Sequence, residues 1–72
     1  MAVRTYTIYF NLPEFPGEYA VQGWTSHLNT SEPDGDIQTA ATLDAARLLV
    51  PSGMTYLHRH PTDDPTIVEV WV

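Results

Sequence analysis

The segment from His58 to Asp64 is the part of this sequence in which titratable side chains are most concentrated. On a strand, His58 and His60 would point to the same side, about 6–7 Å apart at ~3.3 Å per residue. Two imidazoles and the carboxylate of Asp63 are ligand types that Zn²⁺ takes. The spacing matches no established metal signature, however, and the flanking prolines are typical of a surface turn. We therefore expect a turn and keep a metal site at His58, His60 and Asp63 as the alternative.

Arg59 is expected to lie across that strand from the two histidines. Its guanidinium can pair with Glu69 on the neighbouring strand or with Asp63 or Asp64 in the turn, a contact of about 0.2–1 kcal/mol. The alternative is that Arg59 recognises a carboxylate of a partner protein. The sequence has no cysteine, no glycine-rich phosphate loop and no nucleophile–histidine–acid arrangement. We expect a protein that is not an enzyme and has no cofactor.

The charge balance restricts the classes of partner. Nine acidic residues stand against three basic ones, and the net charge is −6. Nucleic acids and anionic membranes require a basic surface, so we expect neither as a direct partner. A net charge of this size is ordinary for solubility. The alternative is a DNA mimic, a phage- or mobile-element-type inhibitor of a nucleic-acid-handling enzyme, although the acids are spread through loops rather than in a dense array.

The 72 residues predict one small domain, residues 1–72. A domain of this size buries only about 60% of its unfolded surface, and no disulfide is available to add stability. The start of the chain has no apolar signal segment, and no stretch approaches the ~20 apolar residues of a membrane span. We expect a cytoplasmic protein.

Hydrophobic patterning predicts an α+β fold with four strands, at residues 3–12, 18–25, 54–60 and 66–72. A helix is predicted over residues 39–50, with Thr39 or Thr42 as its N-cap. Residues 26–36 are predicted to form a polar loop. If both strand pairs are hairpins and the helix crosses between them, this ββαββ domain has a four-stranded mixed sheet of order 2-1-4-3. Its first and last strands would run parallel at the centre, with the helix packed on one face.

The pattern also predicts which side chains meet. One side of the helix is apolar, and the predicted core contains Ile8, Phe10, Leu43, Ala46, Leu49, Val50, Val68, Val70 and Val72. Leu48 is expected on the polar side of the helix. Gly23 inside a strand indicates a bulge or a close backbone approach.

The terminal strand is apolar on both of its faces, which implies cover on both. A single helix covers only one, so the opposite face should be bare and carry Tyr9, Ile67 and Trp71, joined by Tyr19, Val21 or Tyr56. Tyrosine and tryptophan on an uncovered sheet are typical interface anchors. The leading hypothesis is an acidic, non-enzymatic interaction module that binds itself, as a homodimer, or another protein. Burial of Tyr9, Ile67 and Trp71 would supply the affinity, and Arg59 would fix the orientation.

Overall fold

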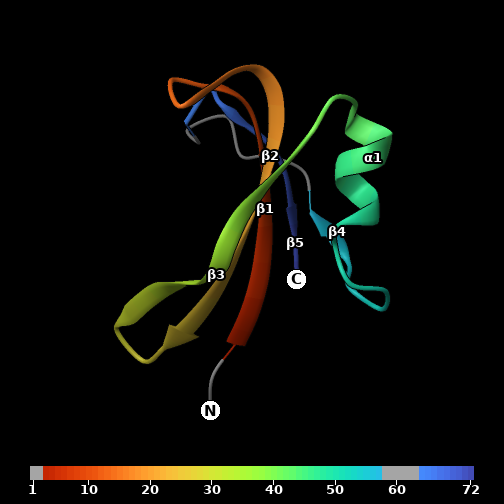
Figure 1. Ribbon diagram of the computed structural model, residues 1–72. Helices are drawn as coiled ribbons and strands as arrows, with labels where there is room; N and C mark the ends of the chain where they lie inside the picture. The colour runs from red at the N-terminus through yellow and green to blue at the C-terminus, as the bar shows by residue number, and fades with distance from the viewer. Residues whose placement is uncertain (1–2, 58–63) are drawn as a thin grey trace.

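The computed structural model describes residues 3–57 and 64–72. Within them the elements are β1 (Val3–Leu12), β2 (Phe15–His27), β3 (Thr30–Ala40), α1 (Leu43–Leu48), β4 (Tyr56–Leu57) and β5 (Ile67–Trp71). The strands form one sheet of order β3-β2-β1-β5-β4 (Figure 1). Every neighbouring pair in it is antiparallel.

The predicted fold class is wrong, because the structure is a five-stranded antiparallel sheet with one short helix and is predominantly β. The predicted four-stranded mixed sheet of order 2-1-4-3 did not include the strand that residues 30–40 form, which is β3. This extra strand reverses the chain before the helix, so every later element runs in the opposite direction to the predicted one. The terminal strand β5 consequently lies antiparallel to β1 rather than parallel.

The strand β3 occupies the part of the sequence that was expected to be a loop. It follows β2 in a hairpin in which His27 pairs with Thr30. Pro33 is accommodated because an edge strand needs no donor on its open side. Gly35 has a φ of 82° and lies in a register shift, where Val21 pairs with Gln38 but Gly23 pairs with Asp34. Proline and glycine thus mark an edge and a bulge here rather than the end of the sheet.

The close approach expected at Gly23 is confirmed. A Cβ at this position would stand 3.0 Å from Cε2 of Tyr6 and 3.2 Å from the backbone oxygen of Asp34. Tyr6 is the residue paired with Gly23 across β1 and β2, and its ring occupies the space that a Cβ at Gly23 would need. A larger residue would push the ring away from the sheet.

The helix α1 is shorter than the predicted 39–50 span, because residues 39 and 40 belong to β3. Thr42 is the N-cap, and its Oγ1 accepts a hydrogen bond from the backbone N–H of Ala45 at 3.1 Å. The predicted apolar side of the helix is confirmed: Ala46 is buried, and Leu43, Leu49 and Val50 pack beside it. As expected, Leu48 is 85% exposed.

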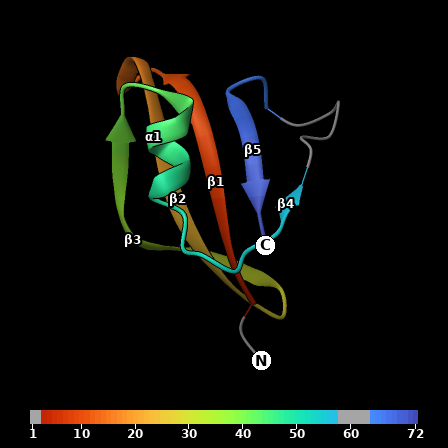
Figure 2. The same cartoon turned by 90° about the vertical axis from the view of Figure 1, so that its right-hand side faces the viewer.

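The core lies between α1 and one face of the sheet, which we call the helix face. Figure 2 shows α1 in front of β2, with β3 and β1 on either side and with β5 and β4 beyond its edge. Ile8, Val21 and Ala46 form the buried centre, and Ile8 is the only large side chain among the described residues that is fully buried. Tyr6, Tyr19, Ala40, Val68 and Trp71 pack around this centre.

Candidate functional site

The face of the sheet opposite α1 is the strongest candidate site, and strand register defines it. Directly paired residues on antiparallel strands share a face, so each row of pairs can be assigned as a unit. Three adjacent rows alternate with the rows that contact the helix. We call them the outer face: Thr5–Trp24–Pro33, Leu57–Val70–Thr7–Gln22 and Ile67–Tyr9–Ala20–Thr39.

No residue in these three rows carries a charge. Of the charged residues with a partner across the sheet, Arg4, Glu32, Asp34 and Glu69 lie in rows of the helix face. Glu18, two residues before Ala20 on β2, lies beyond the third outer row. Arg4 and Asp34 form an ion pair there, with Arg4 Nε 2.8 Å from Asp34 Oδ2. In an ordinary half-solvated antiparallel sheet the polar and charged residues point away from the core. This sheet has the reverse distribution of charge.

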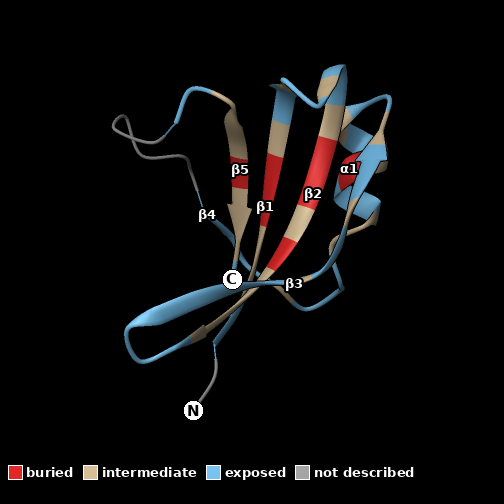
Figure 3. Cartoon of the chain, turned by 60° about the vertical axis from the view of Figure 1, so that its left-hand side comes forward, coloured by how far each residue is buried: buried red, intermediate tan, exposed pale blue. Residues whose placement is uncertain are grey.

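The described chain places no element over the outer face (Figure 3), although part of that face is already sheltered. Ala20 is 0% exposed and Thr7 is 8% exposed. Tyr9, Trp24, Ile67 and Val70 are half-buried, while Leu57 at the β4 edge is 46% exposed. Larger apolar and aromatic side chains therefore shield the small residues Ala20 and Thr7. This composition resembles the centre of a protein interface more than its rim.

Two of the four predicted partner-binding residues lie on this face. Tyr9 and Ile67 are direct partners across β1 and β5. Arg59 lies outside the described residues. Trp71 is on the helix face instead, where it pairs with Tyr6 and packs against the core.

A bulge at Val68 explains why Trp71 was assigned to the wrong face. Ile8 pairs with Glu69 and Tyr9 pairs with Ile67, which leaves Val68 as an extra residue on β5. Strict alternation would put Ile67 and Trp71 on one side, but the extra residue separates them. It also moves Val70 to the outer face and out of the predicted core.

Three further corrections follow from the same register. Tyr19 and Val21 belong to the helix face rather than to the bare one. Tyr56 is opposite Trp71, and the two ring centroids are 5.4 Å apart. Phe10, predicted in the core, is 40% exposed and contacts Tyr19, with ring centroids 4.7 Å apart.

Sequence reasoning missed Trp24, Val70 and Leu57 as outer-face residues. The signal for Trp24 was present, because alternation along β2 puts Ala20, Gln22 and Trp24 on one side. The signal for Val70 was hidden by the bulge. The β4–β5 pairing that places Leu57 beside Val70 depends on register, which a two-residue strand does not reveal.

The helix face contains a buried carboxylate at Glu69, which is 2% exposed. Nε of Arg47 donates to both of its oxygens at 3.1 Å, and the second guanidinium nitrogen donates to Oε2. The indole N–H of Trp71 donates to Oε1 at 3.2 Å. The Arg47 hydrogen bonds lower the pKa of Glu69 from its ordinary value, against the burial that raises it, and the Trp71 bond lowers it further. Glu69 is thus paired with Arg47 of α1, whereas the arginine considered for it from the sequence was Arg59.

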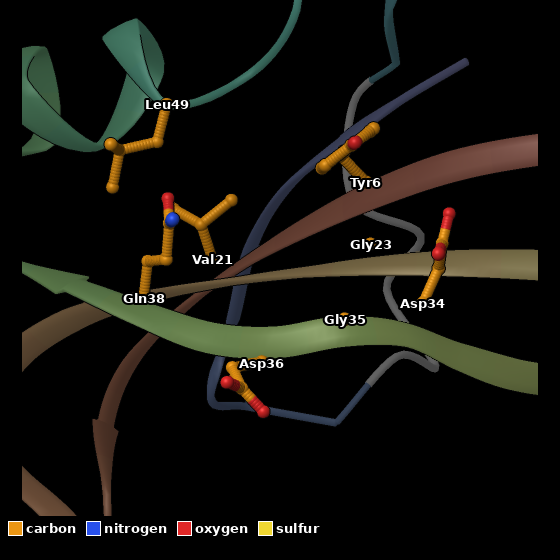
Figure 4. A pocket seen from close by; sticks show the side chains of 8 residues that line it. All are labelled: Tyr6, Val21, Gly23, Asp34, Gly35, Asp36, Gln38 and Leu49. Carbon is orange, nitrogen blue, oxygen red and sulfur yellow. The ribbon is translucent and has the colours of Figure 1, made fainter.

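A hollow of about 240 Å³ lies between Leu49, next to the end of α1, and the bulged part of β3 (Figure 4). Tyr6, Gln38, Asp34 and Asp36 line it among others. Asp34 is already bound by Arg4 and by the Thr25 hydroxyl, which donates at 3.3 Å. The Asp36 side chain points away from Leu49 and Gln38 in Figure 4. The hollow is smaller than typical ligand sites, and its lining has no histidine, cysteine, serine or threonine; its titratable groups are Tyr6, Asp34 and Asp36.

The predicted metal ligands His58, His60 and Asp63 lie outside the described residues. Among the residues that are described, no three histidine, cysteine or acidic side chains gather in a way that could hold a metal ion. The same part of the chain contains no helix with the length and apolar character needed to cross a membrane.

Comparison of the chain with protein-family models, with curated proteins and with solved structures found no match.

Proposed function

We propose that this chain is a non-enzymatic interaction module that binds a protein through its outer face. The observation that carries the proposal is the absence of charge from the three outer rows of a chain whose net charge is −6. A surface that stays in water gains nothing by excluding charge, whereas charges at the centre of an interface must be desolvated.

The side chains of the outer face support the same proposal. Tyr9 and Trp24 offer large apolar surfaces with a polar group at the tip, the combination favoured at binding anchors. Ile67, Val70 and Leu57 extend the apolar area across β5 and β4. Anchors on central strands are held by pairing on both sides, so little ordering is needed on binding.

Arg59 is retained in the proposal as a residue that orients the partner. Arg4 and Arg47 are engaged within the chain, with Asp34 and Glu69 respectively. Arg59 follows the outer-face residue Leu57 by two positions in the sequence. Replacing it with glutamine should weaken partner binding without loss of the fold.

No comparable observation favours the DNA-mimic alternative. A mimic needs carboxylates free to meet the cations of an enzyme, but Asp34 and Glu69 are each bound by an arginine of the same chain. The metal alternative is tested by elemental analysis of untagged protein.

The test is a binding comparison of two matched variants. Trp24→Thr removes an outer-face anchor and introduces a β-branched residue, which suits a strand, as at its partner Thr5. Leu48→Thr removes an exposed apolar side chain from α1, on the other side of the molecule. Tagged wild-type chain should capture a protein from the source cells, or an untagged copy of itself. We expect Trp24→Thr to reduce capture at least tenfold while Leu48→Thr leaves it unchanged, and equal capture by both variants would contradict the proposal.

A further inference from the structure

We infer that the occupant of the outer face is a second copy of this chain, packed face to face in a two-fold dimer. The inference rests on the proposed function and makes it specific. Three properties favour a second copy of the chain over an unrelated protein as the partner. They are the absence of charge from the outer face, its hydroxyl groups, and the position of the charged residues on the opposite, helix face.

The centre of a two-fold interface should contain no charged residues. In such an interface the same patch is used twice, so residues near the axis meet their own counterparts. A charge there would face an identical charge in a poorly solvated setting, whereas an apolar side chain meets its equal without penalty. All eleven residues of the outer rows satisfy this condition. A dissimilar partner would instead be expected to use the −6 charge for recognition.

The polar groups of the face are also compatible with a copy. Thr5, Thr39 and Tyr9 carry accessible hydroxyls, each of which can donate and accept a hydrogen bond. A hydroxyl can therefore pair with the same hydroxyl, unlike a carboxylate or a guanidinium. The amide nitrogen of Gln22 is already used within the chain, since it donates to the backbone oxygens of Gly23 and Gly35.

Face-to-face packing also separates the charges of the two copies. Packed sheets lie about 10 Å apart, and the rows that contain Arg4, Glu32, Asp34 and Glu69 point away from the shared interface on both sides. These four charges of one copy would then lie on the order of 20 Å from those of the other, more than twice the ~8 Å screening length at physiological salt. Contact through the helix face or the acidic β3 edge would place like charges together.

The size of the face sets the expected strength. Three rows about 7 Å apart, each with up to four residues on strands about 4.8 Å apart, cover about 20 Å by 20 Å, below the ~800 Å² that a standard interface takes from each partner. We expect a weak dimer, with a Kd of about 10 μM to 1 mM.

The experiment is NMR spectroscopy of the full chain over about 20 μM to 2 mM, a range that covers most of the expected Kd interval, with sedimentation for mass. The mass should rise from 8.1 kDa toward twice that value. In a mixture of labelled and unlabelled chains, contacts between copies should involve Tyr9, Trp24, Leu57, Ile67 and Val70. Leu57→Glu should raise the Kd at least tenfold, while Leu48→Glu on α1 should not change it.

The outcomes separate this inference from the proposed function. A monomer throughout the range overturns the dimer, and the proposed function then stands if Trp24→Thr reduces capture of a different protein at least tenfold. A dimer whose contacts lie on α1 or on the β3 edge overturns the dimer inference and leaves the outer face without its expected role. If the spectrum shows that Leu57→Glu does not fold, the contacts between copies of the wild-type chain alone decide whether the dimer forms through the outer face.

Discussion

At the scale of single residues, Glu69 shows how much one buried carboxylate can depend on its partner. Arg47 and Trp71 occupy its oxygens, so removing the guanidinium leaves a buried charge with one weak donor. We expect Arg47→Met, which keeps most of the aliphatic stem, to lower the free energy of unfolding by about 2–3 kcal/mol. Urea denaturation followed by circular dichroism measures this change.

The matched control is Arg4→Met, which removes the other described arginine pair. The side chains of Arg4 and Asp34 are 59% and 36% exposed, so water screens their attraction. We expect a loss below about 1 kcal/mol. Equal losses for the two variants would mean that the burial of Glu69 adds nothing to the strength of its pair.

The Glu69 pair also predicts a dependence on pH with a definite sign. Its pKa is lowered in the folded chain, mainly by the Arg47 hydrogen bonds. A lowered pKa contributes stability that is present above the unfolded value of about 4.3 and is lost as pH falls through the folded pKa. The difference in unfolding free energy between wild type and Arg47→Met should therefore be full at neutral pH and shrink as the pH falls below about 4. A difference that stays constant to pH 2 would assign the loss to packing instead.

Predictions for single residues were correct where a local rule determines the contacts of a side chain. They were wrong where the register between strands determines which face it lies on. The apolar side of α1 and the close approach at Gly23 follow from local rules and are confirmed. The face of Trp71 depends on the extra residue Val68 in β5, which no alternation pattern reveals. The partner of Glu69 was missed for the same reason, because Glu69 faces the helix only once the bulge is known.

At the scale of elements, the start of the helix offers a direct test. Thr39 and Thr42 were both candidates for the N-cap, and the structure assigns the cap to Thr42. We expect Thr42→Ala to cost about 1 kcal/mol, because the N–H of Ala45 loses its acceptor in a helix of only six residues. Thr39→Ala, at an exposed position of β3, should cost less than about 0.5 kcal/mol. Thermal melts of the two variants measure the difference, and the reverse order would contradict the assigned cap.

The elements that sequence reasoning missed share one physical cause. Propensity describes a residue in the middle of a regular strand, whereas β3 is an edge strand with Pro33 on an open side and Gly35 at a register shift. Composition therefore predicted a loop there. Because β3 also reverses the chain before α1, this one omission changed the predicted direction of β5 and with it the fold class.

At the scale of the whole molecule, two observations belong together: the core is small and the outer face is neutral. Four apolar residues among those described are buried, Ile8, Ala20, Val21 and Ala46, and two of them are alanines. A core of this size leaves a 72-residue chain with little margin over its conformational entropy. Association through the outer face would bury Tyr9, Trp24, Ile67 and Val70 more completely, and would add the second apolar layer that the single helix cannot provide.

The stability of the chain should consequently depend on its concentration. Each tenfold rise in concentration adds up to about 0.7 kcal/mol per chain, the limit reached once dimers dominate, which raises the Tm of a domain of this size by up to about 3–6 °C. Calorimetry between about 0.1 and 2 mM, around the expected Kd, measures this shift. Leu57→Glu should melt at a Tm that does not change with concentration, whereas Leu48→Glu should keep the wild-type dependence because it leaves the outer face intact. A wild-type Tm that stays constant over this range would mean that the small core suffices by itself, since a chain stabilised by its own copy must become harder to unfold as copies become more abundant.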